Sequence, residues 1–149
     1  MKRKNPIRRS AFTLIEVVVV IVILVTLASI ATPLYMNYIK RANVSAAKTQ
    51  IKMFDDALTN YKMDVGSYPE TDAGLQALVE NPDDNEKWRG PYLKPASIPK
   101  DPWGNEYVYT RPGENDRPYD IVCYGADGQP GGDGENADIT SYDGTEENK

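Results

Sequence analysis

Apolar residues form one long run near the N-terminus of the chain. Residues 11–35 read AFTLIEVVVVIVILVTLASIATPLY, and Glu16 is the only charged residue among them. At 1.5 Å per residue, the ~20 apolar residues after Glu16 reach across a bilayer core of ~30 Å. A lone segment in lipid must satisfy its own backbone hydrogen bonds, and only a helix does so. The pattern therefore predicts a transmembrane helix, in which Pro33 should kink or locally open the backbone.

Beyond this run, the apolar positions take the spacing of an amphipathic helix, with steps of three and four residues. Their stripe spans less than three heptads, which favours packing on a small sheet over a coiled coil. Gly and Pro coincide at residues 66–69, so one helix of about 50 residues is predicted from Phe12 to about Val65. The stripe consists of Val44, Ala47, Ile51, Phe54, Leu58 and Tyr61, and the charged residues off it are Lys48, Lys52, Asp55 and Asp56. The paired acids Asp55 and Asp56 are expected to form a solvated face of the helix.

The rest of the chain predicts short elements. Thr71 and Asp72 can cap a short helix over residues 74–79. Residues 106–110 and 119–124 alternate enough for two strands, and the turn between them makes them an antiparallel pair. The fold class is therefore α+β: one long helix, with a transmembrane first half, packed on a small antiparallel sheet.

The charges are distributed unevenly. The chain has 17 Lys and Arg against 22 Asp and Glu, a net charge of -5, yet residues 1–10 hold five basic side chains and no acid. A basic segment ahead of an apolar run stays cytoplasmic. The acidic remainder would repel phosphate, which argues against nucleic-acid binding.

The composition excludes several kinds of chemistry. The chain has no His, and Cys123 is its single Cys. A zinc site of His and Cys ligands, a His-based catalytic triad and an internal disulfide are therefore excluded. Cys123 is expected to be a small buried residue in a strand, and the sequence indicates no enzyme.

Three interpretations of the apolar run compete. A cleaved secretory signal has an apolar region of about 7–15 residues, followed by small residues at the cleavage site. Here the small residues Ser10 and Ala11 precede the run. A plain anchor fits the length but leaves Glu16 unexplained, since a carboxylate costs a few kcal/mol in hydrocarbon and needs a partner. On the residues alone, a plain anchor and a more specialised segment both remain open.

A resemblance decides between them. Residues 10–17, SAFTLIEV, resemble the processing motif of type IV prepilins and pseudopilins. The resemblance implies that a membrane peptidase removes residues 1–11 by cleaving between Ala11 and Phe12, and then methylates the amine of Phe12. Glu16 would neutralise that amine on a neighbouring subunit, and the family has a proline matching Pro33, so both are assembly residues. The family nearly always has Gly where this chain has Ala11.

A second resemblance is narrower. Over most of residues 10–143 the chain resembles the major pseudopilins of type II secretion, although Glu106 stands where that family usually has Pro. The matching segments, in order, are GSYP (66–69), GLQALV (74–79), GPYL (90–93), DPWGN (101–105), GADG (125–128) and ADI (137–139).

This resemblance implies a role and a domain organisation. Residues 12–35 would be the transmembrane and filament-core helix, residues 36–143 the periplasmic domain, and residues 144–149 a flexible tail. The chain would be a subunit anchored in the inner membrane that polymerises with itself and with minor pseudopilins into a periplasmic filament. A prepilin peptidase and an inner-membrane platform would act on it, and the filament would help to drive folded proteins across the outer membrane.

The segment at residues 125–138, GADGQPGGDGENAD, is rich in Gly and acids. On the residues alone a flexible solvated loop is favoured, although carboxylates and turned carbonyls are also the ligands of Ca²⁺. The resemblance implies one calcium ion here. Its ligands would be the side chains of Asp127 and Asp138 and the carbonyls of Tyr124 and Gln129, with Asp133 and Glu135 as further candidates.

Two alternatives remain beside this interpretation. A type IV pilus subunit for adhesion or motility often closes a C-terminal loop with a disulfide, which a single Cys cannot form. A membrane-tethered calcium-binding module would leave the spacing of Phe12 and Glu16 unexplained.

Overall fold

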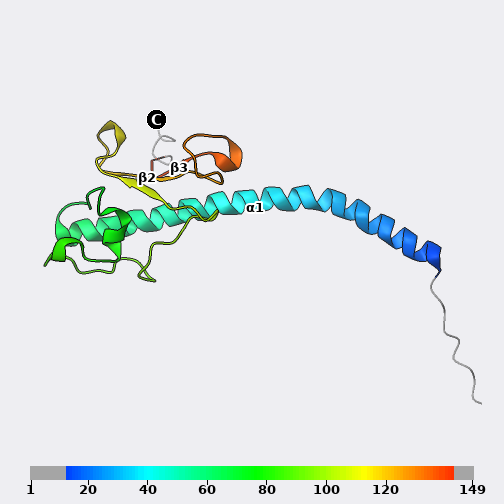
Figure 1. Ribbon diagram of the computed structural model, residues 1–149, viewed down its shortest axis with the longest axis horizontal. Coiled ribbons are helices and arrows are strands. Elements are labelled where there is room, and N and C mark those ends of the chain that lie inside the picture. The colour runs from blue at the N-terminus through cyan, green and yellow to red at the C-terminus, as the bar shows by residue number, and fades with distance from the viewer. Residues whose placement is uncertain (1–12, 143–149) are drawn as a thin grey trace, which may run out of the picture. The chain divides into compact units, whose positions relative to one another are not determined.

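The computed structural model describes residues 13–142 and contains one long helix and a small sheet (Figure 1). Helix α1 spans Leu14–Val65 and continues through Pro33 without interruption. The kink expected at Pro33 stays a prediction. The chain divides into two compact units, one ending at Ile39 and the other beginning at Lys40.

In the first unit, α1 is apolar and exposed. Every residue from 14 to 38 is exposed, and α1 is the one helix of the described residues long and apolar enough to cross a membrane. Polar side chains inside this stretch bond to their own helix: the hydroxyls of Ser29 and Thr32 donate to the carbonyls of Thr26 and Ala28 at 2.8 and 2.7 Å. An exposed apolar surface of this extent requires lipid or other protein around it.

In the second unit, α1 supplies one side of the core. The predicted stripe is confirmed: its last five members are buried and Val44 is half-buried. Ala57 is also buried, which the stripe did not include. Leu58 is fully enclosed, so truncating it to Ala would cost about 2–5 kcal/mol. The buried members of the stripe are Ala47, Ile51, Phe54, Leu58 and Tyr61.

The end of α1 also agrees with the sequence. Gly66 follows the last helical residue with φ +97°, a left-handed conformation that Gly adopts without steric cost.

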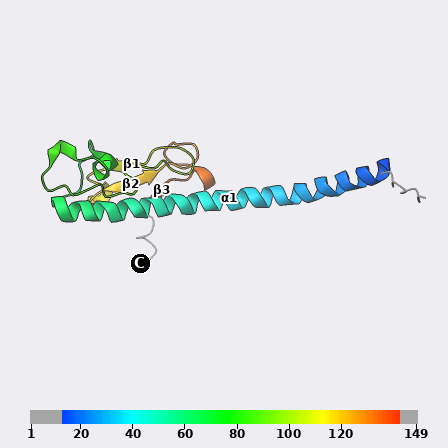
Figure 2. The ribbon, with the colours of Figure 1, turned by 90° about the horizontal axis from the view of Figure 1, so that it is seen from below.

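The sheet has three antiparallel strands, in the order β1-β2-β3 (Figure 2). Strand β1 is Val108–Thr110, β2 is Asp120–Cys123 and β3 is Ile139–Thr140. The predicted pairing of the first two strands is confirmed, although each strand is shorter than expected. Strand β3 was not predicted, because two residues are too few to show an alternating pattern.

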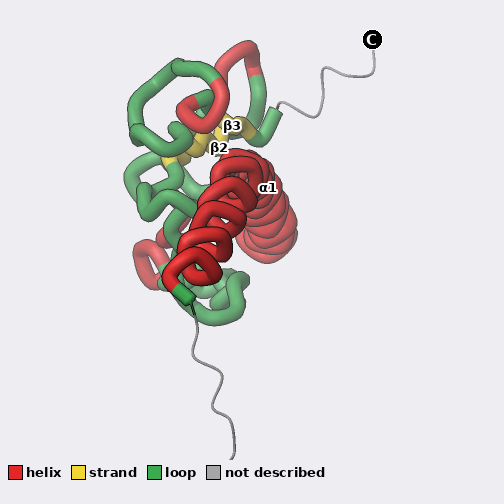
Figure 3. Tube along the Cα trace, turned by 90° about the vertical axis from the view of Figure 1, so that its right-hand side faces the viewer, coloured by secondary structure: helices red, strands yellow, loops and turns green. Residues whose placement is uncertain are grey.

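Most of the second unit outside α1 is loop with single helical turns, as Figure 3 shows. The turns are η1 (Gly74–Leu78), η2 (Pro82–Asp84), η3 (Glu114–Asp116) and η4 (Gly134–Asn136).

Two predictions about polar side chains were wrong. Thr71 does not cap η1, whose N-cap is Ala73 without a side-chain bond. Instead, its hydroxyl donates to the Arg111 carbonyl and accepts from the Arg111 N–H, both at 2.8 Å. Asp55 is not simply solvated, because it accepts a hydrogen bond from the Tyr119 hydroxyl at 2.7 Å. In both cases a residue distant in sequence offers a better partner than water or the local backbone.

Candidate functional site

The first predicted site lies at the start of α1. The Glu16 N–H donates to the Thr13 hydroxyl at 3.4 Å, and the Thr13 N–H donates to Glu16 Oε2 at 3.5 Å. This reciprocal pair has the pattern of a capping box, here with long bonds. Glu16 thus has a partner within its own chain, and the Thr-x-x-Glu spacing is the signal that could have predicted it. Ala11 and Phe12, the predicted cleavage and methylation site, lie outside the described residues.

The second predicted site is the glycine-rich loop, residues 125–138, and the structure closes it at its base. The Ala126 N–H donates to the Glu135 carbonyl at 2.9 Å, and the Asn105 side-chain amide donates to the Gly125 carbonyl at 2.9 Å. Gly125 has φ +63°, and a Cβ on it would collide with the backbone of residues 135 and 136. The two ends of the loop therefore lie side by side, and a side chain at position 125 would push them apart.

The acids of this loop have different partners. Asp138 accepts the Gly131 N–H at 3.0 Å and so reaches across the loop, whereas Asp127 accepts the N–H of nearby Gln129 at 3.1 Å. Tyr124 is half-buried at the base of the loop, and the side chain of Asp133 is exposed. Within residues 13–142, no three His, Cys, Asp or Glu side chains gather closely enough to form a metal-binding cluster. The predicted calcium ligands are two side-chain carboxylates and two backbone carbonyls, so they do not amount to a cluster of three such side chains.

Glu135 has a partner outside the loop. Its Oε2 lies 3.2 Å from Nζ of Lys40 in α1, so an ion pair fastens the loop to the first turn of the second unit. Sequence reasoning did not predict this contact, because the two residues are 95 positions apart and neither shows a local pattern.

Asn105 links the base of the loop to a buried pair of side chains, Asp101 and Cys123. Asp101 is 5% exposed, and its Oδ1 accepts the Trp103 and Asn105 N–H groups at 3.0 and 2.8 Å. The Cys123 thiol donates to Asp101 Oδ2 at 3.2 Å. Burial, together with the nearby carboxylate, raises the pKa of the Cys123 thiol to about 12. The prediction that Cys123 is a buried strand residue is confirmed, and a thiol held protonated in this way is a poor nucleophile.

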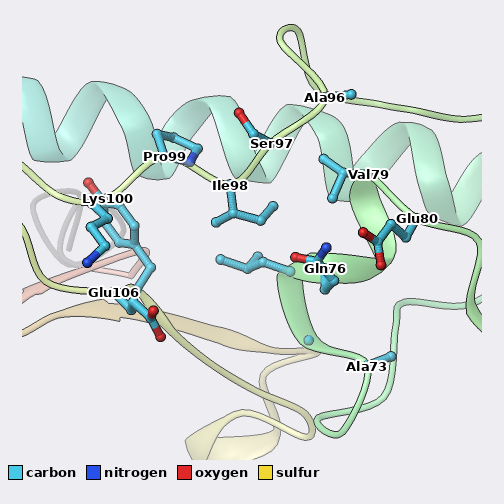
Figure 4. Close-up of a pocket in the computed structure, with 13 residues that line it drawn as sticks. Ala73, Gln76, Val79, Glu80, Ala96, Ser97, Ile98, Pro99, Lys100 and Glu106 are labelled. Atoms are coloured by element: carbon cyan, nitrogen blue, oxygen red, sulfur yellow. The ribbon is translucent and has the colours of Figure 1, made fainter.

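The structure also has a recess of about 570 Å³ between η1 and the loop at residues 96–100 (Figure 4). Apolar side chains such as Ile98 and Val79 line it, together with the charged Glu80, Lys100 and Glu106. One common kind of catalytic site combines a nucleophile, a base and an orienting group within hydrogen-bond reach of one another. No hydrogen bond or ion pair of the described residues joins two of these three charged side chains.

Comparisons with known proteins agree with this architecture. The family model described as type II secretion system (T2SS), protein G, matches residues 34–142, and that of the prokaryotic N-terminal methylation motif matches residues 7–32. The type II secretion system core protein G of Vibrio cholerae is 43% identical over 138 residues, covering 91% of this chain and 92% of the relative. The core protein G of Pseudomonas aeruginosa is 44% identical over 140 residues, covering 91% and 96%.

A solved structure gives the same result. The crystal structure of the major pseudopilin from the type 2 secretion system of enterohaemorrhagic Escherichia coli aligns with a TM-score of 0.60 and 29% identity. The alignment covers 72% of this chain and 92% of that one.

An exposed apolar helix that carries an N-terminal methylation motif and continues into a small α+β domain defines the class of pilin-like filament subunits. Within this class, the chain belongs to the type II secretion system protein G family. The chain is a structural subunit of the pseudopilus and assembles with other pseudopilins. Its apolar helix and methylation motif fit a subunit anchored in the inner membrane.

Proposed function

We propose that the chain inserts with residues 1–11 in the cytoplasm and residues 36–143 in the periplasm, and is then trimmed by a prepilin peptidase. Trimmed subunits leave the bilayer on an inner-membrane platform and polymerise into a helical filament. The growing filament helps to drive folded proteins across the outer membrane, and the chain itself catalyses no reaction.

The observation that carries this proposal is the exposed apolar surface of α1, joined to a domain of the protein G family. Lipid covers that surface before assembly, and the same helix of neighbouring subunits covers it in the filament. Both environments satisfy the hydrophobic effect, so a subunit can exchange one for the other.

The experiment is a secretion assay on a strain that lacks this gene, with twitching motility scored alongside. We expect exoproteins to accumulate in the periplasm while motility persists, and plasmid-borne wild-type protein to restore secretion. Normal secretion with loss of motility or of surface pili would instead identify a type IV pilus subunit.

We also infer that Glu16 pairs with the amine of Phe12 on a neighbouring subunit. Support comes from the exposure of Glu16 in the single chain and from the weakness of its 3.5 Å bond with Thr13. An unpaired charge buried among apolar helices costs ~3–5 kcal/mol, so the pair would set the register between subunits.

The test of this pairing uses Glu16→Ala and Glu16→Gln. Both variants should be inserted and cleaved but fail to form filaments, because neither carries the neutralising charge. Cross-linking of membrane fractions measures assembly, and normal filaments from either variant would refute the pairing.

We further propose that the glycine-rich loop binds one calcium ion. Asp127 and Asp138 would hold it through carboxylates, and Tyr124 and Gln129 through carbonyls. The donor chemistry fits, because all four supply hard oxygen ligands and the loop ends are closed at its base. Asp133 is a further candidate, whereas Glu135 would first have to leave Lys40. The bound ion would fix a part of the chain that has little core of its own.

The test is thermal unfolding with calcium and with a chelator. We expect calcium to raise the melting temperature of the wild type, and Asp127→Ala to lower it and remove its calcium dependence. The matched control is Glu86→Ala, which removes an exposed acid outside the loop and should keep the calcium response. An unchanged calcium response in Asp127→Ala would refute the assignment.

A further inference from the structure

Two cations stand next to each other in α1, directly after the apolar residues of the first unit. Lys40 is half-buried and paired with Glu135 of the glycine-rich loop. Arg41 is exposed, and no carboxylate among the described residues lies within 4.0 Å of its guanidinium. Within residues 13–142 the neighbours therefore differ: Lys40 has an acidic partner in the chain, and Arg41 has none.

The residues before Arg41 indicate what surrounds it. Tyr35 and Tyr38 are 64% and 72% exposed, at the end of a stretch long and apolar enough to span a membrane. Tyr at the ends of such helices lies at the level of the lipid headgroups. Arg41 follows Tyr38 by three residues in the sequence, so it comes directly after the apolar stretch.

The orientation of the chain does not account for a cation at this position. Lys and Arg are enriched on the cytoplasmic side of a membrane helix, and the five basic side chains of residues 1–10 already supply that signal. Arg has a planar guanidinium that can donate two parallel hydrogen bonds to a phosphate group. An exposed Arg at headgroup depth, with no acidic partner in the described part of the chain, is complementary to an anionic lipid.

We propose that Arg41 binds the phosphate of an anionic phospholipid in the periplasmic leaflet. The inference rests on the membrane anchoring proposed above. The contact fixes the depth of the subunit in the bilayer, and it is broken when the subunit is extracted into a filament.

The experiment places the full chain in nanodiscs of phosphatidylcholine alone, or with part of it replaced by phosphatidylglycerol. Hydrogen exchange is measured for the amides of residues 36–45. The anionic lipid should slow exchange in the wild type by about fivefold, the factor that corresponds to ~1 kcal/mol for a cation at an anionic surface. Arg41→Gln should lose most of this slowing.

Lys48→Gln is the matched control. It removes the same charge from an exposed position two turns later on the same face of α1, about 10 Å further from the apolar stretch. It should keep the slowing, and the basic residues before position 10 are the same in all three proteins.

Three results would overturn the inference. No effect of Arg41→Gln, or an equal effect of Lys48→Gln, would mean that no lipid is bound specifically at Arg41. Slowing by inorganic phosphate in phosphatidylcholine discs would show a site for free phosphate instead of a lipid. Failure of the wild type to enter phosphatidylcholine discs would refute the membrane anchoring itself, which separates that failure from the other two.

Discussion

At the level of single residues, Asp120 shows how one carboxylate organises a turn. It is 6% exposed, and its Oδ1 accepts a hydrogen bond from Arg117 Nε at 2.6 Å. Its Oδ2 accepts from the Glu114 N–H at 2.8 Å and from Arg117 Nη2 at 3.0 Å. The bonds from Arg117 are the main reason that the pKa of Asp120 lies below its usual value.

This lowered pKa predicts how stability depends on pH. A carboxylate whose pKa falls on folding contributes stability in full above its unfolded pKa of about 3.9, and loses it as pH falls through the folded pKa. Asp120→Asn should therefore melt several degrees below the wild type at pH 7, and the difference should shrink below about pH 3.9. Thermal unfolding from pH 7 to pH 2 measures this.

The control for Asp120 is Asp116→Asn, which changes an exposed acid in the same turn. It should melt close to the wild type at every pH. A difference between wild type and Asp120→Asn that stays constant down to pH 2 would mean that the carboxylate does not carry the effect.

The sequence predicted the burial of single residues better than their polar partners. Burial of Cys123 followed from its place in an apolar strand. Its bond with Asp101 did not, because the partner comes from a loop 22 residues away. The ion pair of Lys40 with Glu135 was missed for the same reason. A burial pattern is local in sequence, whereas a polar partner depends on how distant loops fold back.

At the level of elements, tyrosine hydroxyls join α1 to the rest of the domain. The Tyr119 hydroxyl donates to Asp55 of α1 at 2.7 Å. The Tyr92 hydroxyl donates to Asp64 of α1 at 3.0 Å. The Tyr107 hydroxyl donates to Gln50 of the same helix. Burial raises the pKa of Tyr119 well above its usual range, with a further contribution from Asp55, so the hydroxyl remains a donor. These bonds add fixed directions to an apolar contact that by itself is not directional.

The bond of Tyr119 with Asp55 can be tested by a double-mutant cycle. Tyr119→Phe should lower the free energy of unfolding by about 1–3 kcal/mol, because a hydrogen bond to a charged group is lost. Adding Asp55→Ala should then cost much less than it does alone. Tyr68→Phe is the control, since its ring packs on Tyr119 but no hydrogen bond of its hydroxyl is found among the described residues. The free energies of unfolding are measured by urea unfolding. If the effects of Tyr119→Phe and Asp55→Ala are additive, the two side chains are not coupled energetically.

The sequence predicted those elements in which apolar residues recur at a regular spacing. The stripe on α1 and the first two strands follow from spacings of three to four and of two residues. The short turns and β3 are set by contacts across the chain, as Thr71 shows by bonding to Arg111 instead of capping η1. The calcium ligands rest on the resemblance, since neither the spacing of the acids nor the contacts among the described residues gathers them into one cluster.

At the level of the whole molecule, one helix serves two environments. Residues 14–38 of this helix are exposed in the described part of the chain, whereas its later residues supply one side of the core of a folded domain. A subunit of this kind is stable in the membrane because lipid covers the apolar part. It is also able to polymerise, because other copies offer the same cover. In the function proposed above, removal of residues 1–11 would link the two states, since an uncut chain would keep its basic segment ahead of the apolar helix.

Cleavage after Ala11 is therefore the last prediction. The subunit recovered from cells should begin at Phe12 with one methyl group on its amine, as intact-mass spectrometry would show. Ala11→Gly should be processed at least as fast as the wild type, whereas the larger side chain of Ala11→Leu should leave the precursor uncut. The control is Ala28→Leu, the same substitution inside the apolar stretch, which should be processed normally.

Uncut Ala11→Leu should also fail to form filaments, because Glu16 of its neighbours would find no free amine to pair with. Filaments built from uncut precursor would show that the pairing of Glu16 is dispensable, and a fully cut Ala11→Leu would show that the peptidase does not require a small residue there.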